Sequence, residues 1–304
     1  LAFTLADGFA YIEAGIEAGL DVDDFAPRLS FFFNSHIDFF EEICKFRAAR
    51  RIWATVLKEK YGAKDERSLR MRFHTQTAGV SLTAQEPYNN VARTAFEALA
   101  AILGGTQSLH TNSLDEALAL PTEEAVRIAV RTQQIAALET GVANTIDPLG
   151  GSYFVEALTD DLERQAYDYF KQIDELGGMI QAIEQGFPMR EISEASARYQ
   201  RELEEKKRYM VNVNVYEPQD EQDMELHRID PEVSKGQLDR LEELKESRDN
   251  DRVEQCLEEL KQACRGDKNT MYPILEAVRA YATVGEISVA MQDVFGDYRE
   301  TPVI

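Results

Sequence analysis

Three short segments near the start of the chain alternate polar and apolar side chains, and helix-length amphipathic stretches separate them. The segments are 28–34 (RLSFFFN), 70–76 (RMRFHTQ) and 106–112 (TQSLHTN). Alternation with a period of two predicts strands, and apolar residues at helical spacing predict helices at about 38–61 and 90–103. Strands that alternate with helices are typical of parallel βαβ units. The pattern therefore predicts an α/β fold, in which a leading helix at 1–19 ends a preceding unit.

Each predicted strand has one hydrogen-bonding face and one mostly apolar face, because successive side chains point to opposite sides. The hydrogen-bonding faces carry Arg28 and Ser30, then Arg70, Arg72, His74 and Gln76, then Thr106, Ser108, His110 and Asn112. A closed (β/α)8 barrel normally fills its interior with Val, Ile and Leu, and unpaired Arg and His there would cost several kcal/mol each. Polar faces pointing inward predict that a polar ligand occupies the barrel axis. The alternative is that the strands lie at a sheet edge, where Arg72 and His74 are simply solvated.

The side chains of this polar face constrain the ligand. Arg28 and Arg72 supply fork-shaped donors that suit phosphate or carboxylate. Side chains that suit amides and hydroxyls are Ser30, Gln76, Ser108 and Asn112. The sequence therefore predicts a long, partly anionic ligand.

Composition argues against several other classes of function. The chain has 55 acidic and 33 basic residues and a formal charge of −22, which disfavours direct nucleic-acid binding. Only 11 of the basic residues are lysine, which fits either a high-salt cytoplasm or an ordinary acidic protein. No apolar stretch matches the ~18 uncharged residues of a membrane span, so no membrane partner is expected.

Motifs for familiar catalytic and metal chemistry are not found in the sequence. It contains no GxGxxG, GxxxxGK[ST] or HExxH, and none of its four histidines stands in a recognisable nucleophile motif. Cys44, Cys256 and Cys264 lack zinc or disulfide spacing, so we expect no metal site and a reducing, cytoplasmic compartment.

Beyond residue 112 the pattern is mostly helical, with a break at Pro121 and a loop at 147–154 (DPLGGSYF) before long helices from about 156 to 207. We predict a first region at 1–215, an acidic linker at 216–236 and a helical terminal region at 237–304. The helices predicted in that last region span about 237–246, 251–265, 271–281 and 286–294.

Two long strings, 72–133 (RFHTQTAGVSLTAQEPYNN through AVRIAVRTQ) and 146–159 (IDPLGGSYFVEALT), closely resemble the methylmalonyl-CoA mutase family of acyl-CoA mutases. The resemblance runs from residue 1 through 210–216 (MVNVNVY) and, more weakly, through 282–296 (ATVGEISVAMQDVFG). It implies an isomerase that uses adenosylcobalamin to rearrange the carbon skeleton of acyl-CoA thioesters through radicals. It also implies a partial (β/α)8 TIM barrel with the CoA tail along its axis, in which this chain holds the last three βα units and a mostly helical C-terminal extension.

The resemblance assigns site residues position by position. Those matching positions that bind the CoA thioester are Arg28, Ser30, Arg72, His74 and Ser108. Those matching cobalamin-contacting positions are Gln76, Gly79, Glu116, Ala119 and Gln200. The bare backbone of Gly79 suits close approach to a flat ring, and Glu116 and Ala119 are spaced to share one face of a helical turn. For Gln200, a plain surface glutamine is the alternative.

The resemblance also implies parts that this sequence lacks. The catalytic, acyl-reading residues are expected N-terminal to Leu1, in a missing first half of the barrel. A separate cobalamin-binding subunit is an expected partner, because none of the four histidines stands in the family's DxHxxG motif. On this interpretation the chain is the C-terminal half of a catalytic chain that interconverts methylmalonyl-CoA and succinyl-CoA.

Two alternatives remain open. One is a large subunit acting on isobutyryl-CoA or 2-hydroxyisobutyryl-CoA, because 31–42 (FFFNSHIDFFEE) departs from the tryptophan- and glycine-containing version typical of methylmalonyl-specific chains. The other is a non-catalytic partner that binds CoA or cobalamin and completes a barrel contributed elsewhere.

Overall fold

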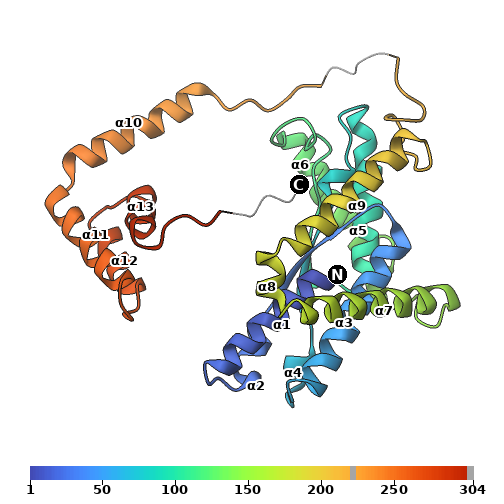
Figure 1. Ribbon diagram of the computed structural model, residues 1–304. Helices are drawn as coiled ribbons and strands as arrows, with labels where there is room; N and C mark the ends of the chain where they lie inside the picture. Colours follow the sequence, from blue (N-terminus) through green and yellow to red (C-terminus); the bar gives the residue numbers. More distant parts are fainter. Residues whose placement is uncertain (220–223, 300–304) are drawn as a thin grey trace. The chain divides into compact units, whose positions relative to one another are not determined.

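The computed structural model describes residues 1–219 and 224–299, which divide into two compact units between His227 and Arg228 (Figure 1). Both units are rich in helix, and all three strands of the described residues belong to the first unit. Among the described residues, no helix combines the length and hydropathy that a membrane span needs.

The first unit is built on a small parallel sheet. Its strands, in spatial order, are β1 (Phe31–Ser35), β2 (Phe73–Thr77) and β3 (Ser108–His110). The connection from β1 to β2 contains α3 (Phe39–Glu59), and the connection from β2 to β3 contains α5 (Asn90–Leu103). The predicted α/β class and parallel βαβ order are confirmed, and the helix predicted at 90–103 has the predicted bounds.

β1 begins later than the alternation predicts. Pro27 lies in a 3-10 turn, Ala26–Arg28, and the strand starts only at Phe31. Proline has a fixed φ and no N–H to donate to a strand ladder, so Pro27 favours the turn, and the ladder forms only after it. The prediction that Arg28 and Ser30 lie within a strand is therefore wrong: both precede β1 and are exposed.

β2 also starts late, and a short helix ends just before the predicted strand. Asp65 caps α4 (Glu66–Leu69) by accepting the Arg67 N–H. The ladder begins at Phe73, and Arg72 meets it only through its carbonyl, which accepts the Phe31 N–H at 2.9 Å. The Arg72 side chain thus stands at the amino end of β2 rather than inside the strand, where the sequence predicted it.

The apolar side of the sheet packs on α3, which begins after Asp38 accepts the Glu41 N–H. Phe46 of α3 stacks on Phe73 of β2, with ring centroids 5.2 Å apart. The buried cluster around this contact includes Leu5, Ile12, Phe33, Ile52, Trp53 and Leu57. Each such side chain contributes about 1.5–3 kcal/mol by leaving water, so the sheet is held by its apolar face and the polar face stays free for other contacts.

The remaining helices of the first unit are α1 (Ala2–Glu17), α2 (Val22–Phe25), α6 (Glu123–Leu138), α7 (Tyr153–Glu175), α8 (Met179–Glu184) and α9 (Phe187–Glu204). The helical stretch predicted at 156–207 is thus interrupted. Gly178 and Gly186 separate its three helices with φ values of 105° and 71°, which favour glycine. Segment 210–216 contains one isolated bridge, Val211 to Val215, rather than a strand.

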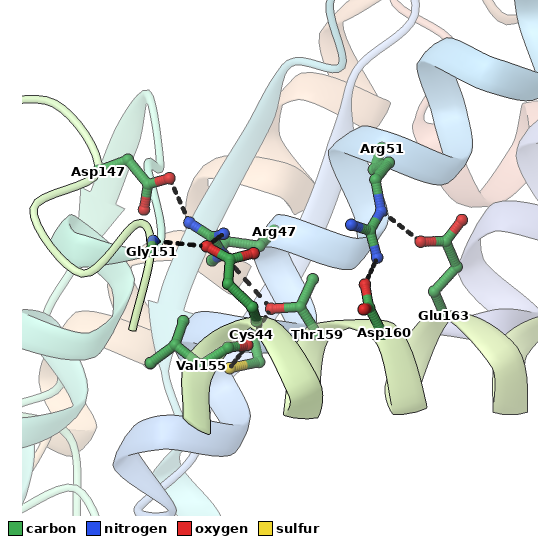
Figure 2. Close-up of polar contacts among 10 residues, drawn as sticks. Cys44, Arg47, Arg51, Asp147, Gly151, Val155, Thr159, Asp160 and Glu163 are labelled. Atoms are coloured by element: carbon green, nitrogen blue, oxygen red, sulfur yellow. Dashed lines mark hydrogen bonds and ion pairs between the residues drawn. The ribbon is translucent and has the colours of Figure 1, made fainter. Parts of the chain in front are cut away.

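α7 packs against α3, and two arginines one helical turn apart on α3 join the helices (Figure 2). Arg47 forms ion pairs with Asp147 and with Glu156, the latter at 2.7 Å, and Arg51 pairs with Asp160 at 2.6 Å. Glu156 also accepts the Gly151 N–H at 2.8 Å. The Gly151 N–H and the Arg47 guanidinium lower the pKa of Glu156, so the DPLGG loop is fixed to α3 through charged groups.

The second unit consists of α10 (Pro231–Ser247), α11 (Asn250–Cys264), α12 (Met271–Arg279) and α13 (Val284–Phe295). α10 begins earlier than the predicted residue 237, inside the stretch predicted as a linker. The helix starts there because the acidic stretch contains an N-terminal cap. Asp230 accepts the Glu232 N–H, and Pro231 occupies the first turn, where no N–H is needed.

An ion pair links the end of α10 to α13. The Arg248 guanidinium donates two hydrogen bonds to the Glu286 carboxylate, at 2.6 and 2.9 Å, and a third to the Tyr281 carbonyl at 2.8 Å. Glu286 forms a reciprocal capping box with Thr283. These donors, led by Arg248, lower the pKa of Glu286 to about 2.

Candidate functional site

His74 is the centre of a row of side chains that crosses the polar face of the sheet. The strand register places Phe32 of β1 and Ser108 of β3 on either side of it. His74 Nδ1 lies 2.7 Å from Ser108 Oγ, and the Phe32 ring centroid lies 5.1 Å from that of the imidazole. Two predicted substrate residues, His74 and Ser108, are therefore in direct contact.

A second row lies nearer the carboxyl ends of the strands. It consists of Asn34, Gln76 and His110, aligned by the same register. Gln76 follows His74 by two residues, so both side chains point to the same face. The polar face predicted from alternation is confirmed for these inner strand positions.

The loops that leave β2 and β3 meet at Gly79 and Glu116. A Cβ atom on Gly79 would lie 2.6 Å from Glu116 Oε1 and 3.1 Å from Asn112 Nδ2. Asn112 Nδ2 donates to the same Glu116 oxygen at 3.1 Å. The Glu116 carboxylate thus lies in the space beside Gly79, a contact that the sequence did not reveal.

Glu116 and Ala119 lie on one turn, as their spacing predicts. The Asp115 carbonyl accepts the Leu118 and Ala119 N–H groups at 2.9 and 3.0 Å. Glu116 is exposed, yet partial burial of its carboxyl raises its pKa, with Asp115 adding to the effect and His110 opposing it. The turn therefore presents a carboxyl group beside the second row of the sheet.

The remaining predicted substrate residues lie at the opposite, amino end of the sheet. Arg72 is exposed and donates to the Pro27 carbonyl, which joins it to the turn that ends at Arg28. At roughly 3.3 Å per residue, Arg72 and Gln76 are about 13 Å apart along β2. Polar groups thus extend from Arg28 at one end of the sheet to Glu116 at the other, a span that suits an elongated ligand.

Gln200 is placed differently from the other predicted cofactor residues. It is exposed on α9, and its amide donates to Glu204 in the same helix at 2.9 Å. Among the described contacts, none joins it to Gly79 or Glu116.

A family model described as methylmalonyl-CoA mutase matches residues 1–297. The chain belongs to the methylmalonyl-CoA mutase family. It is 48% identical to the methylmalonyl-CoA mutase of Rhizobium meliloti, over 100% of this chain and 43% of the relative. It is 48% identical to that of Escherichia coli, over 98% and 42%, and 46% identical to the human mitochondrial methylmalonyl-CoA mutase, over 98% and 40%.

The resemblance drawn from the sequence strings is thus confirmed for almost the whole chain. The chain spans only about two fifths of the length of these mutases. These relatives are named methylmalonyl-CoA mutase.

Sequence reasoning missed three residues of this mutase chain. Phe32 lies on the polar face and is 56% exposed. Strand alternation alone would have predicted this, because it puts Phe32 on the same face as Ser30. Asn90 and Glu97 are fully buried on α5, and no spacing rule distinguishes them from solvated residues of an amphipathic helix.

Within residues 1–219 and 224–299, no group of three or more His, Cys, Asp or Glu side chains is arranged to hold a metal ion. The described side chains around the sheet offer hydroxyl, amide, imidazole, guanidinium and carboxyl groups.

Proposed function

We propose that the protein containing this chain interconverts methylmalonyl-CoA and succinyl-CoA with adenosylcobalamin. Support comes from family membership over residues 1–297 together with one structural observation, the series of polar side chains along the sheet from Arg72 through His74 to Glu116. An anionic, elongated thioester and a large amide-bearing cofactor both match groups on that surface.

The fold proposed for the whole enzyme is a (β/α)8 barrel. The three parallel strands and their α3 and α5 crossovers would be its last units, and the missing strands would come from the part of the relatives' length that this chain does not span. The proposed divisions are a barrel region at 1–215, an acidic linker that begins at 216, and a helical region that begins with α10 at Pro231 rather than at the predicted residue 237. The boundary between compact units, after His227, falls within that linker and supports the division.

On this proposal Arg28, Ser30 and Arg72 bind the CoA tail, and His74 and Ser108 contact it closer to the thioester. Arg72 is the best placed for an anionic group, because it stands exposed at the open end of the sheet. Phe32 adds an exposed ring beside His74, which offers apolar contact on an otherwise polar face.

The residues around Gly79 and Glu116 fit a large cofactor such as adenosylcobalamin. Gly79 and Glu116 form a surface of bare backbone next to a carboxyl group, and buried Asn112 Oδ1 has no hydrogen-bond partner among the described residues. Gln76, Gly79, Glu116 and Ala119 would hold the cofactor, with Gln200 contributing from α9. When bound, the cofactor supplies a radical by homolysis of its cobalt–carbon bond. This chain's own share is to orient the two ligands and to exclude water from them.

The proposed partners are the first half of the barrel and a cobalamin-binding subunit, because the family resemblance implies both. The proposed compartment is the cytoplasm, supported by three cysteines that are free and buried.

Reconstitution tests the proposal. The chain is co-expressed with the missing barrel half and the cobalamin subunit, and conversion of methylmalonyl-CoA to succinyl-CoA is followed with adenosylcobalamin. Turnover that needs all the parts is expected. Turnover on isobutyryl-CoA alone would show that the substrate is wrong, and turnover without the missing half would show that the barrel argument is wrong.

A variant of the complete enzyme tests the binding surface. Arg72→Ala should raise the KM for acyl-CoA far more than it changes the melting temperature, because the side chain is exposed and lies outside the core. Arg70→Ala is the matched control, since Arg70 is an exposed neighbour that pairs with Glu66 on α4. An equal effect of both variants on KM would remove Arg72 from the site.

A further inference from the structure

The helix α5 buries polar side chains where a crossover helix normally buries apolar ones. Asn90, Thr94 and Glu97 are 0%, 2% and 0% exposed, and their spacing places them on one side of the helix. Burying polar groups is unfavourable unless they are hydrogen-bonded. Thr94 Oγ1 and Glu97 Oε2 have no partner among the described residues, whereas both amide atoms of Asn90 are paired, so the contacts of Asn90 show what this face does.

Asn90 joins the loop after β2 to the loop after β3. Its amide exchanges two hydrogen bonds with the Thr83 backbone: Oδ1 accepts the N–H at 3.0 Å, and Nδ2 donates to the carbonyl at 2.9 Å. Nδ2 also donates to the Leu114 carbonyl at 2.9 Å. One side chain thus holds backbone groups of two loops that are separate in sequence.

A second contact keeps the Asn90 amide oriented. Arg93, one turn further along α5, donates to Asn90 Oδ1 at 2.8 Å and to Thr83 Oγ1 at 2.9 Å. The other nitrogen of its fork donates to the Val211 carbonyl at 2.8 Å. Because both donors and the acceptor of the amide are used, rotating it would break four hydrogen bonds.

The two clamped loops carry the pair that meets beside the sheet. Gly79 lies shortly before Thr83, and Glu116 lies shortly after Leu114. The contact between them is close, since a Cβ on Gly79 would lie 2.6 Å from Glu116 Oε1. A shift of either loop by about one ångström would open or close that contact. Asn90 fixes the distance between the two loops and therefore the geometry of the contact between Gly79 and Glu116.

We propose that Asn90 is a positioning residue for the cofactor: it fixes the two loops so that Gly79 and Glu116 form one surface for the corrin ring and its amides. This inference rests on the proposed function. Asn90 is fully buried and acts through the loops, without touching either ligand. The substrate row at His74 and Ser108 lies within the strands, which are held by the sheet ladder rather than by this clamp.

The test uses the complete enzyme with the variant Asn90→Asp. Aspartate has the same shape but replaces the donor Nδ2 by an oxygen that faces the Thr83 and Leu114 carbonyls, so the loops should separate. The matched control is Asn89→Asp, the same substitution at the exposed preceding residue. Asn90→Ala is a second variant, which removes the clamp without adding charge.

The Kd for the cofactor, the KM for the substrate and the melting temperature are measured for each protein. Equilibrium dialysis against hydroxocobalamin gives the cofactor Kd, and steady-state kinetics give the KM for methylmalonyl-CoA. We expect the cofactor Kd of the Asn90 variants to rise at least about tenfold, which corresponds to about 1.4 kcal/mol, while the KM for acyl-CoA stays within about twofold. Asn89→Asp should change neither value.

Several outcomes would overturn the inference. A folded Asn90 variant with unchanged cofactor Kd, or with Kd and KM raised equally, would show that Asn90 does not position the cofactor surface. Failure of both Asn90 variants to fold would show that Asn90 is needed for folding rather than for positioning the cofactor surface. A wild-type enzyme that binds no cobalamin would instead overturn the proposed function, and this inference with it.

Discussion

Glu97 is a carboxylic acid in a site that favours its neutral form. It is fully buried on α5, and one carboxyl oxygen accepts the Ser81 hydroxyl while the other has no partner among the described residues. Burial raises the pKa of Glu97 to about 8. The Ser81 hydroxyl opposes the shift, Glu42 adds to it and Arg93 reduces it. Glu97→Gln copies the protonated side chain and should therefore stabilise the protein above the ordinary pKa of a glutamate.

The size and sign of the effect follow from proton linkage. In the unfolded chain Glu97 loses its proton near its ordinary pKa of 4.5, whereas in the folded chain it keeps the proton up to about pH 8. Between these values the folded state binds the extra proton, so wild-type stability falls by about 1.4 kcal/mol per pH unit. The free energy of unfolding of Glu97→Gln should equal that of wild type near pH 4.5 and exceed it by about 3 kcal/mol at pH 7. Above about pH 8 the difference should stay constant.

Urea unfolding of wild type and variant over that pH range measures the difference. Glu184→Gln, an exposed glutamate on α8, is the matched control and should show no such slope. A stability difference between Glu97→Gln and wild type that stays constant with pH, or that shrinks as the pH rises, would refute the reasoning. It would mean that Glu97 is ionised in the folded protein.

Three further changes have defined outcomes. Gly79→Ala places a methyl group against the flexible Glu116 carboxyl, so the melting temperature should stay nearly constant while the Kd for cobalamin, measured by equilibrium dialysis, rises. Arg47→Lys keeps the charge but loses the fork that holds the DPLGG loop, so it should lower the free energy of unfolding in urea titrations and speed proteolysis of that loop. Arg248→Ala removes the main cause of the low pKa of Glu286 and should cost about 1–2 kcal/mol at neutral pH. Because that pKa is depressed to about 2, calorimetry should show the cost disappear as the pH falls below 4.5 towards 2.

The sequence predicted the strand interiors well and their beginnings poorly. His74, Gln76 and Ser108 lie on one face because alternation is a direct consequence of strand geometry. The starts depend on competing local structure. The turn around Pro27 displaced Arg28 from its predicted strand, whereas Arg72 lies in the short link between the end of α4 at Leu69 and the start of β2 at Phe73.

The contact between the two loops could not be predicted from the sequence, for a different reason. Gly79 and Glu116 are brought together by a fold whose strand order and crossover geometry no single segment encodes. Alternation and spacing describe residues close in sequence, whereas this contact joins two loops across a helix. The family resemblance named both residues, but it did not indicate that the carboxyl of one fills the space left by the other.

α5 shows where periodicity stops being informative about burial. Its bounds were predicted correctly, and the spacing of Asn90 and Glu97 is that of the polar side of an amphipathic helix, which normally faces water. In a βα unit, however, the helix also borders the loops at the carboxyl ends of the strands. Polar side chains there can satisfy loop backbone groups, as Asn90 does for Thr83 and Leu114. A polar helical stripe next to a ligand-binding loop therefore has two interpretations, solvated surface or buried clamp, and the hydrogen bonds of Asn90 favour the clamp.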